Sequence, residues 1–450
     1  VDLQQAIDRI DPPGKSERAA AARRSAGIIL SKELPHGPEA RGQATPISGP
    51  PERRSLSERE GEAFPMLPVG ADNETATWHE AMNSFETDLV VMRDKDEPEV
   101  CWLAVRPLRP GLPPILLHRL GEAFIPDLGG CRIGDRPIDY HLEVLGNFGA
   151  VIEKLPSGIR MTAPDGLVGT KISLPYPSVG ATEQVLLTAV RAKGKTELSG
   201  AAIEPEIMDL INILQKMGAI ISVDTDRVIR IEGVDSLKGY THRALFDRNE
   251  AASWASAALA TGGDIFVGGA QQAEMLTFLN IFRKVGGAFE IHDDGIRFFH
   301  PGGELKPVVI ETDVHPGFMT DWQQPLVIAL TKAQGVSIVH ETVYEQRFGF
   351  VDALIKMGAN IQLHSECLGG HPCRFGQRNF LHSAVISGPT ELHGADIEVP
   401  DLRGGFSHLI AALTAKGTSR VSNVGIISRG YGDFITKLRQ LGADFVIEGE

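Results

Sequence analysis

Two residue types suited to proton transfer stand in short motifs of this sequence. Cys131 lies in the string GGCRIGDRPIDYH (129–141), where the paired glycines suggest a mobile loop. An arginine near the thiol would lower its pKa, so that Cys131 could serve as an acid or a nucleophile. Asp321 lies in HPGFMTDWQQP (315–325), just before an apolar helix. It could act as a general base, or it could simply cap that helix.

A second set of residues is suited to binding anions. Arg347 lies in ETVYEQRF, Arg403 in VPDLRGG and Arg429 in SRGYGDF. Arginine forks match carboxylates and phosphates, although a single arginine is more often a solvated surface residue. The run PSVGAT, which contains Ser178 and Gly180, enters a predicted helix. It offers backbone N–H groups to an anion, or only a helix cap.

One short loop raises the question of a metal. Cys367 and Cys373 lie close together in SECLGGHPC, with His364 and His371 nearby. Zinc uses such ligands, but this spacing matches no common zinc motif and no second cysteine pair follows. The sequence therefore predicts an ordinary loop and no metal site. The four cysteines are also too few and too scattered for a disulfide framework.

A recurring unit must position these residues: an amphipathic helix that ends at glycine and is followed by a short strand. In PEIMDLINILQKMGA (205–219) apolar residues recur every three or four positions, which predicts one buried helix face. Five such units occur, and each predicted helix ends at a glycine suited to the left-handed conformation: Gly149, Gly218, Gly286, Gly358 and Gly442. Their spacing of roughly 70 to 85 residues indicates a large supersecondary repeat. A sixth unit, which would complete an even pair of domains, should lie in residues 1–112, where the sequence shows none.

The chain of 450 residues is long enough for two or three domains, and its composition is that of a globular protein. Its net charge of −14 argues against a nucleic-acid surface, and no apolar run is long enough to span a membrane. Without an apolar signal segment, the sequence predicts a cytoplasmic protein. Residues 1–112 are rich in Pro, Arg, Glu and Ser and show no helix or strand period. They are either a loosely ordered extension or a region that has diverged or is translated in an altered frame.

Taken together, six strings in this order resemble the MurA-type enolpyruvyl transferases, the UDP-N-acetylglucosamine 1-carboxyvinyltransferase family. They are GGCxIGxRPxDxH, PSVGAT, HPxFxTD, ExxxExRF, DLR and RGY, and the resemblance extends from residue 113 to residue 450. It implies an α/β fold with two domains, each an inside-out α/β barrel of three βαβαββ-like units, and an active site between them. One domain would comprise residues 113–245, with the C-terminal segment 428–450 as an optional part. The other would comprise residues 246–427.

The resemblance also implies a reaction and a set of site residues. The enolpyruvyl group of phosphoenolpyruvate would pass to the 3-hydroxyl of UDP-N-acetylglucosamine, with release of phosphate, in peptidoglycan precursor synthesis. Cys131 would be the loop residue that acts as general acid or in product release and that fosfomycin alkylates, and Asp321 would be the general base. Phosphoenolpyruvate would be bound by four arginines: Arg136, Arg347, Arg403 and Arg429. The nucleotide sugar would be bound by Arg136, Pro137, Ile138, Asp139 and His141 at the uridine, by Ser178, Val179 and Gly180 at the diphosphate, and by Asp321 and Val343 at the sugar. No metal, organic cofactor, nucleic acid or membrane is implied, and we expect a monomer or weak oligomer.

Several positions depart from the family pattern. The family's N-terminal Ser-Gly-Ala-Lys-Asn string has no counterpart beyond ISGP (47–50), so a lysine for phosphoenolpyruvate and an asparagine for the sugar nucleotide are missing. Met92 and Arg93 could match a family Met-Arg pair, at a longer distance from the cysteine loop. Asp127 and Leu128 replace Leu-Pro before that loop, Tyr140 replaces leucine, and Ser428 and Gly432 replace acidic residues.

These differences leave two alternatives open. The acceptor could be another uridine nucleotide such as UMP, in nucleoside-antibiotic assembly, because the Arg-Pro-x-Asp-x-His string serves both acceptors. The chain could also be an inactive relative that binds nucleotide sugars, although the retained Cys131, Asp321 and arginines argue against this. A shikimate 3-phosphate acceptor is disfavoured because the uridine and cysteine strings are those of the MurA type.

Overall fold

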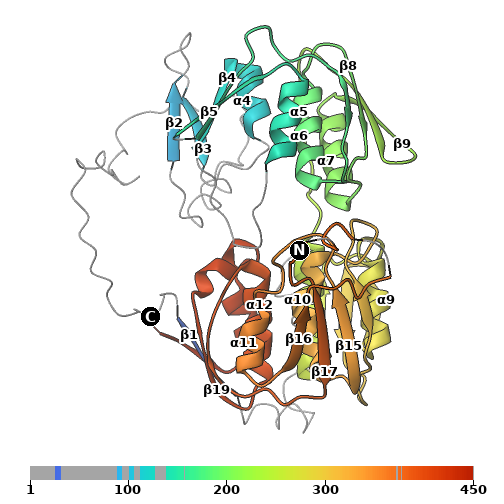
Figure 1. Cartoon of the computed structure of the whole chain (residues 1–450), viewed down its shortest axis with the longest axis vertical. Helices are drawn as coiled ribbons and strands as arrows, with labels where there is room; N and C mark the ends of the chain where they lie inside the picture. Colours follow the sequence, from blue (N-terminus) through green and yellow to red (C-terminus); the bar gives the residue numbers. More distant parts are fainter. Residues whose placement is uncertain are drawn as a thin grey trace, which may run out of the picture.

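The computed structural model describes residues 26–31, 89–93, 101–105, 112–126, 138–156, 158–370, 373–376 and 378–448. Cys131, Arg136, Pro137 and the string at 47–50 lie outside these residues. Figure 1 shows two groups of helices and strands, one above the other. We call the elements from β2 to β10 the N-terminal lobe, and those from α8 to β20 together with β1 the C-terminal lobe.

The N-terminal lobe combines short helices with small sheets. Its helices are α4 (Leu112–Leu120), α5 (Asp139–Asn147), α6 (Val179–Ala189) and α7 (Pro205–Lys216). Its strands are β2 (Leu89–Arg93), β3 (Cys101–Val105), β4 (Glu122–Pro126), β5 (Val151–Leu155), β6 (Gly158–Thr162), β7 (Lys171–Ser173), β8 (Lys195–Ser199), β9 (Ile220–Asp224) and β10 (Val228–Glu232). They form the sheets β4-β6-β5 and β7-β8-β10-β9 and the antiparallel pair β2-β3. Met92 and Arg93 lie in β2.

The described residues of the C-terminal lobe form three sheets. Its helices are α8 (Arg248–Thr261), α9 (Leu276–Val285), α10 (Thr320–Leu330), α11 (Val351–Lys356), α12 (Leu402–Thr414) and α13 (Phe434–Gln440), with 3-10 helices η2 (Gln272–Glu274) and η3 (Val424–Arg429). The sheets are β11-β13-β12, β14-β15-β17-β16 and β18-β19-β1-β20. Their strands are β11 (Asp264–Gly268), β12 (Ala288–His292), β13 (Gly295–Phe299), β14 (Val309–Glu311), β15 (Gly335–His340), β16 (Asn360–His364), β17 (Ser383–Gly388), β18 (Asp396–Glu398), β19 (Gly417–Ser422), β1 (Ala26–Ser31) and β20 (Phe445–Glu448).

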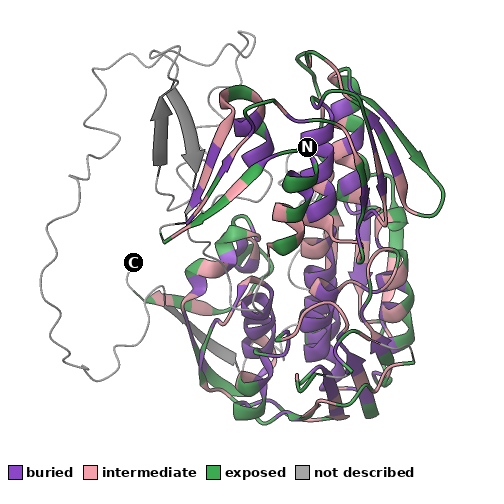
Figure 2. Ribbon diagram, turned by 45° about the horizontal axis from the view of Figure 1, so that its top comes forward, coloured by how far each residue is buried: buried purple, intermediate pink, exposed green. Residues whose placement is uncertain are grey.

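Three helices form the centre of the C-terminal lobe. In α8, α10 and α12 buried residues occur on every side, and the three helices contact one another. A helix that is apolar all round is stable only when it is enclosed, which explains why the three sheets surround them. Figure 2 shows this buried centre in purple. Asp321 and Arg403, two of the predicted site residues, lie at the N-terminal ends of α10 and α12, so this packed core positions them.

The repeating helix–glycine–strand unit is confirmed at all five places. Helices α5, α7, α9, α11 and α13 are followed by strands β5, β9, β12, β16 and β20. The five glycines have positive φ angles: Gly149 97°, Gly218 100°, Gly286 117°, Gly358 101° and Gly442 84°. A side chain would be strained in this conformation, so glycine is the residue that lets the chain leave the helix and enter the strand. Three of the units lie in the C-terminal lobe, one beside each of its sheets.

The C-terminal segment packs with the C-terminal lobe. Strand β20 pairs in parallel with β1, which also pairs in parallel with β19. Phe434 and Leu438 of α13 belong to the large hydrophobic cluster that includes Trp254 and Phe406, whereas the residues of the N-terminal lobe form a separate cluster around Phe148. We therefore propose that segment 428–450 belongs to the second domain rather than the first. The other domain limits stay a prediction.

Candidate active site

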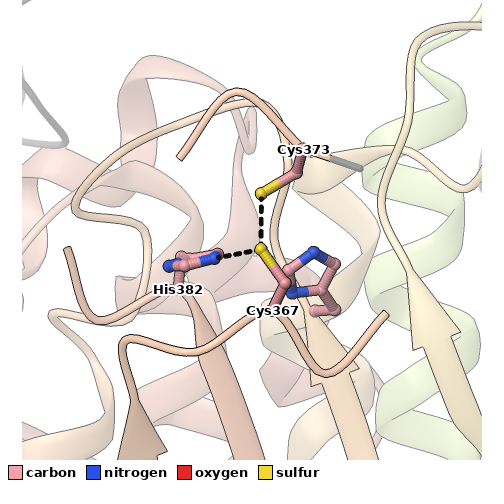
Figure 3. A group of neighbouring side chains, drawn as sticks. Cys367, Cys373 and His382 are labelled. Carbon is pink, nitrogen blue, oxygen red and sulfur yellow. Dashed lines mark hydrogen bonds between the residues drawn. The ribbon is translucent and has the colours of Figure 1, made fainter. Parts of the chain in front are cut away.

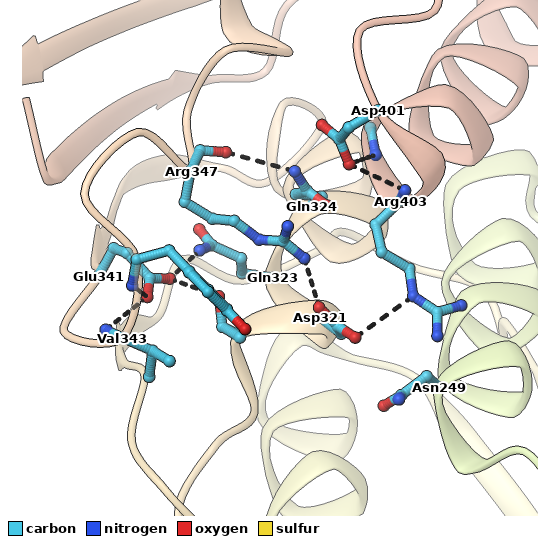
Figure 4. A network of polar contacts seen from close by, with 12 residues as sticks. Asn249, Asp321, Gln323, Gln324, Glu341, Val343, Arg347, Asp401 and Arg403 are labelled. Carbon is cyan, nitrogen blue, oxygen red and sulfur yellow. Dashed lines mark hydrogen bonds and ion pairs between the residues drawn. The ribbon is translucent and has the colours of Figure 1, made fainter. Parts of the chain in front are cut away.

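Asp321 lies between two buried arginines (Figure 4). Its Oδ1 accepts a hydrogen bond from Nη2 of Arg347, and its Oδ2 lies 3.4 Å from Nε of Arg403. Asp321 is in the first turn of α10, but the N-cap position belongs to Met319 and has no side-chain hydrogen bond. The interpretation of Asp321 as a helix cap is therefore wrong, and its carboxylate is used in the arginine pair instead.

The two arginines control the charge of this carboxylate. Burial would raise the pKa of Asp321, but the guanidiniums of Arg347 and Arg403 outweigh it and hold that pKa below its ordinary value. Burial likewise opposes the charge of Arg347, yet Asp321 and other acidic neighbours keep the Arg347 pKa raised. The side chain of Asp321 keeps 26% of its surface exposed, against 2% for Arg347. The carboxylate is thus both ionised and accessible.

Both arginines retain hydrogen-bonding capacity. Nε of Arg347 and Nη1 of Arg403 are buried and have no hydrogen-bond partner among the described residues. An unpaired buried donor is costly, so such groups in a native protein call for an explanation, and a bound ligand is one. Two unpaired guanidinium donors beside one carboxylate can bind an anionic substrate. Arg347 and Arg403 are buried, so they are not the solvated surface residues that a single arginine usually is.

Arg403 is positioned by the start of α12. Asp401 caps this helix and accepts hydrogen bonds from the backbone N–H groups of Arg403 at 3.0 Å and Gly404 at 3.1 Å. The Arg403 guanidinium lies over the ring of Tyr431, 5.1 Å from its centroid, and Nη2 is 3.7 Å from Oδ2 of Asp247. Tyr431 is fully buried, and its hydroxyl is 2.8 Å from Ser253. The RGY string thus reaches this site through Tyr431, while Arg429 is exposed at the end of η3.

A buried glutamate holds the turn that carries Val343. Oε1 of Glu341 accepts hydrogen bonds from the backbone N–H of Val343 at 2.6 Å and of Tyr344 at 2.9 Å. Its Oε2 accepts from Thr320 at 2.9 Å and from Gln323 of α10. Burial raises the pKa of Glu341, and these hydrogen bonds oppose that effect. Glu341 therefore ties the Val343 turn to the helix that carries Asp321, as Figure 4 shows.

The PSVGAT string and the histidine of RPIDYH meet in the N-terminal lobe. A Cβ added at Gly180 would lie 2.9 Å from Cε1 of His141, so only glycine lets α6 approach this ring without a shift. Nδ1 of His141 is 3.4 Å from Oε1 of Gln184 on the same helix. Burial lowers the pKa of His141, which favours the neutral ring. Ser178 caps α6, because its hydroxyl accepts from the N–H of Ala181 at 3.3 Å.

The other residues predicted for this part of the site lie beside these contacts. Val179 opens α6 and is half-buried. Ile138 is half-buried and Asp139, which opens α5, is exposed. Helix α5 packs against α6. The N-terminus of α6 combines backbone N–H groups with the positive end of the helix dipole, which suits a diphosphate.

The two lobes make polar contacts at His315, the first residue of the HPGFMTD string. Nη2 of Arg227 donates to the carbonyl oxygen of His315 at 2.6 Å, and Glu204 accepts from the N–H of His315 at 3.3 Å. Arg248 of α8 forms a two-pronged ion pair with Glu206 of α7, at 2.8 and 2.9 Å. These contacts bring the motif that carries Asp321 beside the N-terminal lobe.

Several of these residues were not found from the sequence. Glu341 stands in the ETVYEQRF string, but its role depends on backbone donors that only the folded turn presents. Arg248 pairs with Glu206, which lies 42 residues earlier in the chain. The sequence marks Arg248 only by its place at the start of α8, which does not reveal this partner. Arg374 donates to the carbonyl oxygen of Val343 and lies 4.7 Å from the ring centroid of Tyr176, which precedes PSVGAT. Nothing in the sequence indicates that the segments of Arg374, Val343 and Tyr176 lie together.

Known proteins share both this fold and these motifs. The EPSP synthase (3-phosphoshikimate 1-carboxyvinyltransferase) family model matches residues 83–438. A UDP-N-acetylglucosamine 1-carboxyvinyltransferase of Protochlamydia amoebophila is 51% identical over 327 residues, which are 72% of this chain and 70% of that protein. The protein of that name from Chlamydia trachomatis serovar D is 47% identical over 321 residues, 71% of this chain and 72% of that protein. The solved structure of the enolpyruvyl transferase NikO from Streptomyces tendae superimposes with a TM-score of 0.64 at 22% identity, over 79% of this chain and 84% of that one.

The fold and the names of these relatives define the class of protein, an α/β transferase. The family match is more specific: this chain belongs to the EPSP synthase family of enolpyruvyl transferases. The predicted α/β enolpyruvyl transferase fold is thereby confirmed. No helix among the described residues is long and apolar enough to cross a membrane.

Proposed function

We propose that the chain transfers the enolpyruvyl group of phosphoenolpyruvate to the 3-hydroxyl of UDP-N-acetylglucosamine and releases phosphate, a step in peptidoglycan precursor synthesis. The observation that carries the proposal is the carboxylate of Asp321 held between Arg347 and Arg403, each of which has a buried donor to spare. The names of the similar proteins from Protochlamydia and Chlamydia support this acceptor.

The arginines would bind phosphoenolpyruvate. Its carboxylate is a planar anion and its phosphate a tetrahedral one, and both match guanidinium forks. Arg347 and Arg403 would use the donors that the described residues leave unpaired. Arg136 and Arg429 would complete the set, with Arg136 also reaching the nucleotide. Arg136 lies outside the described residues.

Asp321 would act as the general base. The sugar 3-hydroxyl would give its proton to Asp321 as its oxygen bonds to C2 of phosphoenolpyruvate, while C3 gains a proton. The tetrahedral intermediate would then lose a proton from C3, and the C2–O bond to phosphate would break. Cys131 would supply an acid in the first step or assist product release, although it lies outside the described residues.

Substrate binding would activate this base. In the free protein the guanidiniums lower the pKa of Asp321 and make it a weak base. An anionic substrate that draws Arg347 and Arg403 toward itself weakens both ion pairs, so the basicity of Asp321 rises when phosphoenolpyruvate is present. The site would therefore be best suited to proton abstraction only when it is loaded.

The acceptor would lie across the two lobes. Arg136, Pro137, Ile138, Asp139 and His141 would line the uridine, Ser178, Val179 and Gly180 the diphosphate, and Val343 and Asp321 the sugar. The close packing of Gly180 on His141 supports one continuous nucleotide site. A neutral His141 suits contact with an uncharged base or ribose. The expected cytoplasmic location, and a monomeric or weakly associated state without membrane or nucleic-acid partners, stay predictions.

Phosphate release from phosphoenolpyruvate tests the proposal. The purified chain would be assayed with UDP-N-acetylglucosamine, UMP and shikimate 3-phosphate as separate acceptors. Release with the first supports the proposal and means that the missing Lys-Asn pair is compensated elsewhere. Release with UMP alone would assign the chain to nucleoside chemistry, and silence with all three, alongside nucleotide binding, would make it an inactive relative.

A further inference from the structure

Four metal-ligating side chains converge at one end of the sheet β14-β15-β17-β16. His340 is the last residue of β15, His382 immediately precedes β17, and Cys367 follows β16 in the loop that also carries Cys373. One ligand atom from each of the four lies within 4.8 Å of the others. The two histidines are fully buried, Cys367 is exposed and Cys373 is half-buried. The cluster is therefore buried on the side of the two histidines and covered, on the side of the two cysteines, by the described residues 365–370 and 373–376.

The distances within the cluster suit a single tetrahedral ion. Sγ of Cys367 lies 3.3 Å from Sγ of Cys373 and 3.4 Å from Nε2 of His382 (Figure 3). Zinc bonds of about 2.3 Å to sulfur and about 2.05 Å to nitrogen place tetrahedral ligands about 3.8 Å apart for two sulfurs and about 3.6 Å for sulfur and nitrogen. These two pairs thus need to move apart by only a few tenths of an ångström, while the widest pair of ligand atoms, which are all within 4.8 Å of one another, would close by up to about an ångström.

Hydrogen bonds orient both imidazole rings toward the cluster. Nδ1 of His382 is 2.8 Å from the carbonyl oxygen of Phe380, so it carries the proton and leaves Nε2 as a lone-pair donor. Nδ1 of His340 is 2.9 Å from the hydroxyl of Ser383. That hydroxyl donates its own proton to the carbonyl oxygen of Glu366 at 2.7 Å, so it accepts from His340. Ligating histidines in metalloproteins have this second-shell arrangement.

The second ring nitrogen of His340, Nε2, is buried and has no hydrogen-bond partner among the described residues. Two glycines bring the covering loop close. A Cβ at Gly369 would lie 2.3 Å from Cδ2 of His340, next to Nε2, and a Cβ at Gly376 would lie 3.0 Å from Sγ of Cys367. The loop is thus packed directly over the ligand atoms.

We propose that His340, Cys367, Cys373 and His382 form a structural zinc site. Two thiolates and two neutral imidazoles in a closed tetrahedral set are a donor set that zinc prefers, with no position left for a reacting water. The sequence predicted no metal here, because the spacing of the two cysteines matches no common zinc motif and no second cysteine pair follows. The ligating histidines come from strand ends that are distant in the chain. Metal binding at this cluster does not depend on the proposed function.

The site would fix a loop that reaches the active site. Arg374 follows Cys373, donates to the carbonyl oxygen of Val343 and lies over Tyr176 of the N-terminal lobe. His340 is next to Glu341, which holds the other side of the same turn. Zinc would therefore hold Arg374 against the turn that we assign to the sugar. Arg374 is a positioning residue in this scheme, and loss of zinc should raise the KM for the nucleotide sugar more than it lowers kcat.

The metal content of the untagged full chain tests the proposal. Protein expressed with added zinc should contain about one zinc per chain, measured by mass spectrometry of the metal. Cys367→Ser and Cys373→Ser should each lose most of it, and cobalt loading of wild type should give the thiolate charge-transfer absorption and intense visible bands of a tetrahedral site. His364→Ala is the matched control, since this half-buried neighbour is not among the four ligands, and it should keep its zinc.

Two results would overturn the proposal. One is wild-type protein in which the thiols of both Cys367 and Cys373 react and which takes up neither zinc nor cobalt after reduction and reloading. The other is equal metal content in wild type and in both serine variants, which would place the metal elsewhere. If a serine variant fails to fold, the cobalt spectrum of wild type decides the question alone.

Discussion

Replacing Asp321 by asparagine should separate substrate binding from catalysis. The change keeps the shape of the side chain but removes the charge that competes with phosphoenolpyruvate for Arg347 and Arg403. A hydrogen bond to a charged group contributes about 1.5–3 kcal/mol. The lower value applies here, because the carboxylate is 26% exposed. Since 1.4 kcal/mol corresponds to a factor of ten, the Kd for phosphoenolpyruvate should fall about tenfold.

The same substitution should lower kcat, although it tightens the binding of phosphoenolpyruvate. Loss of a general base costs about 10²- to 10⁴-fold, so kcat should fall within that range while phosphoenolpyruvate binds more tightly. Calorimetric titration of phosphoenolpyruvate alone gives Kd without turnover, and phosphate release gives kcat. Asp352→Asn, an exposed change of the same charge on α11, is the control and should alter neither value.

The pH dependence of the Kd for phosphoenolpyruvate, compared between wild type and Asp321→Asn, tests whether the Asp321 carboxylate is ionised. Because the pKa of Asp321 is held below its ordinary value, the carboxylate stays ionised in the free protein from about pH 8 to pH 5. Its contribution to stability is present above the unfolded pKa and is lost only as the pH falls through the lower folded value. The ratio of the two Kd values should therefore be constant over this range. A kcat loss below tenfold together with an unchanged Kd would refute both roles of Asp321.

Three further changes test other parts of the site. Glu341→Gln should raise the KM for UDP-N-acetylglucosamine and lower the melting temperature. An amide has a single acceptor oxygen, so its NH₂ must face either the N–H of Val343 or the amide of Gln323 and leave a buried donor unpaired, at a cost of about 1–3 kcal/mol. An unchanged KM in steady-state assays would mean that Glu341 does not hold the turn. Gly180→Ala should destabilise the chain, because its Cβ would lie 2.9 Å from His141, although alanine for glycine within a helix otherwise stabilises by about 1 kcal/mol. Urea denaturation should show the lost stability restored by adding His141→Ala, and a Gly180→Ala variant more stable than wild type would contradict this packing. Fosfomycin should add covalently to wild type but not to Cys131→Ala, as seen in intact masses; no adduct under saturating UDP-N-acetylglucosamine would count against a working cysteine loop.

Local patterns predicted the repeating elements well. Apolar spacing fixed the buried helix faces, and a glycine after each helix was enough to place the turn into the next strand, as Gly218 and Gly286 show. Motif order was also sufficient to predict the fold, because six short strings in sequence are far more specific than any one of them. The first signal depends on neighbours within a few residues and the second on the order of short strings along the chain, and a sequence displays both directly.

Pairings between distant segments could not be predicted in the same way. Asp321 has the position of a possible helix cap, and only the folded chain shows that Arg347 and Arg403 take its carboxylate instead. His340 and His382 are adjacent in space because β15 and β17 are antiparallel neighbours, whereas the sequence placed His364 beside the cysteines. Sheet register decides such contacts, and register is set by the whole fold.

Proton NMR of the reaction product tests the central claim most directly. The purified chain, phosphoenolpyruvate and UDP-N-acetylglucosamine would be incubated together, and the vinyl protons followed over time. We predict that the vinyl signals of phosphoenolpyruvate are replaced by those of an enolpyruvyl ether at the sugar 3-position, in equal amount to the phosphate released. Unchanged phosphoenolpyruvate at enzyme concentrations equal to substrate, in a sample where the nucleotide sugar is bound, would contradict the account.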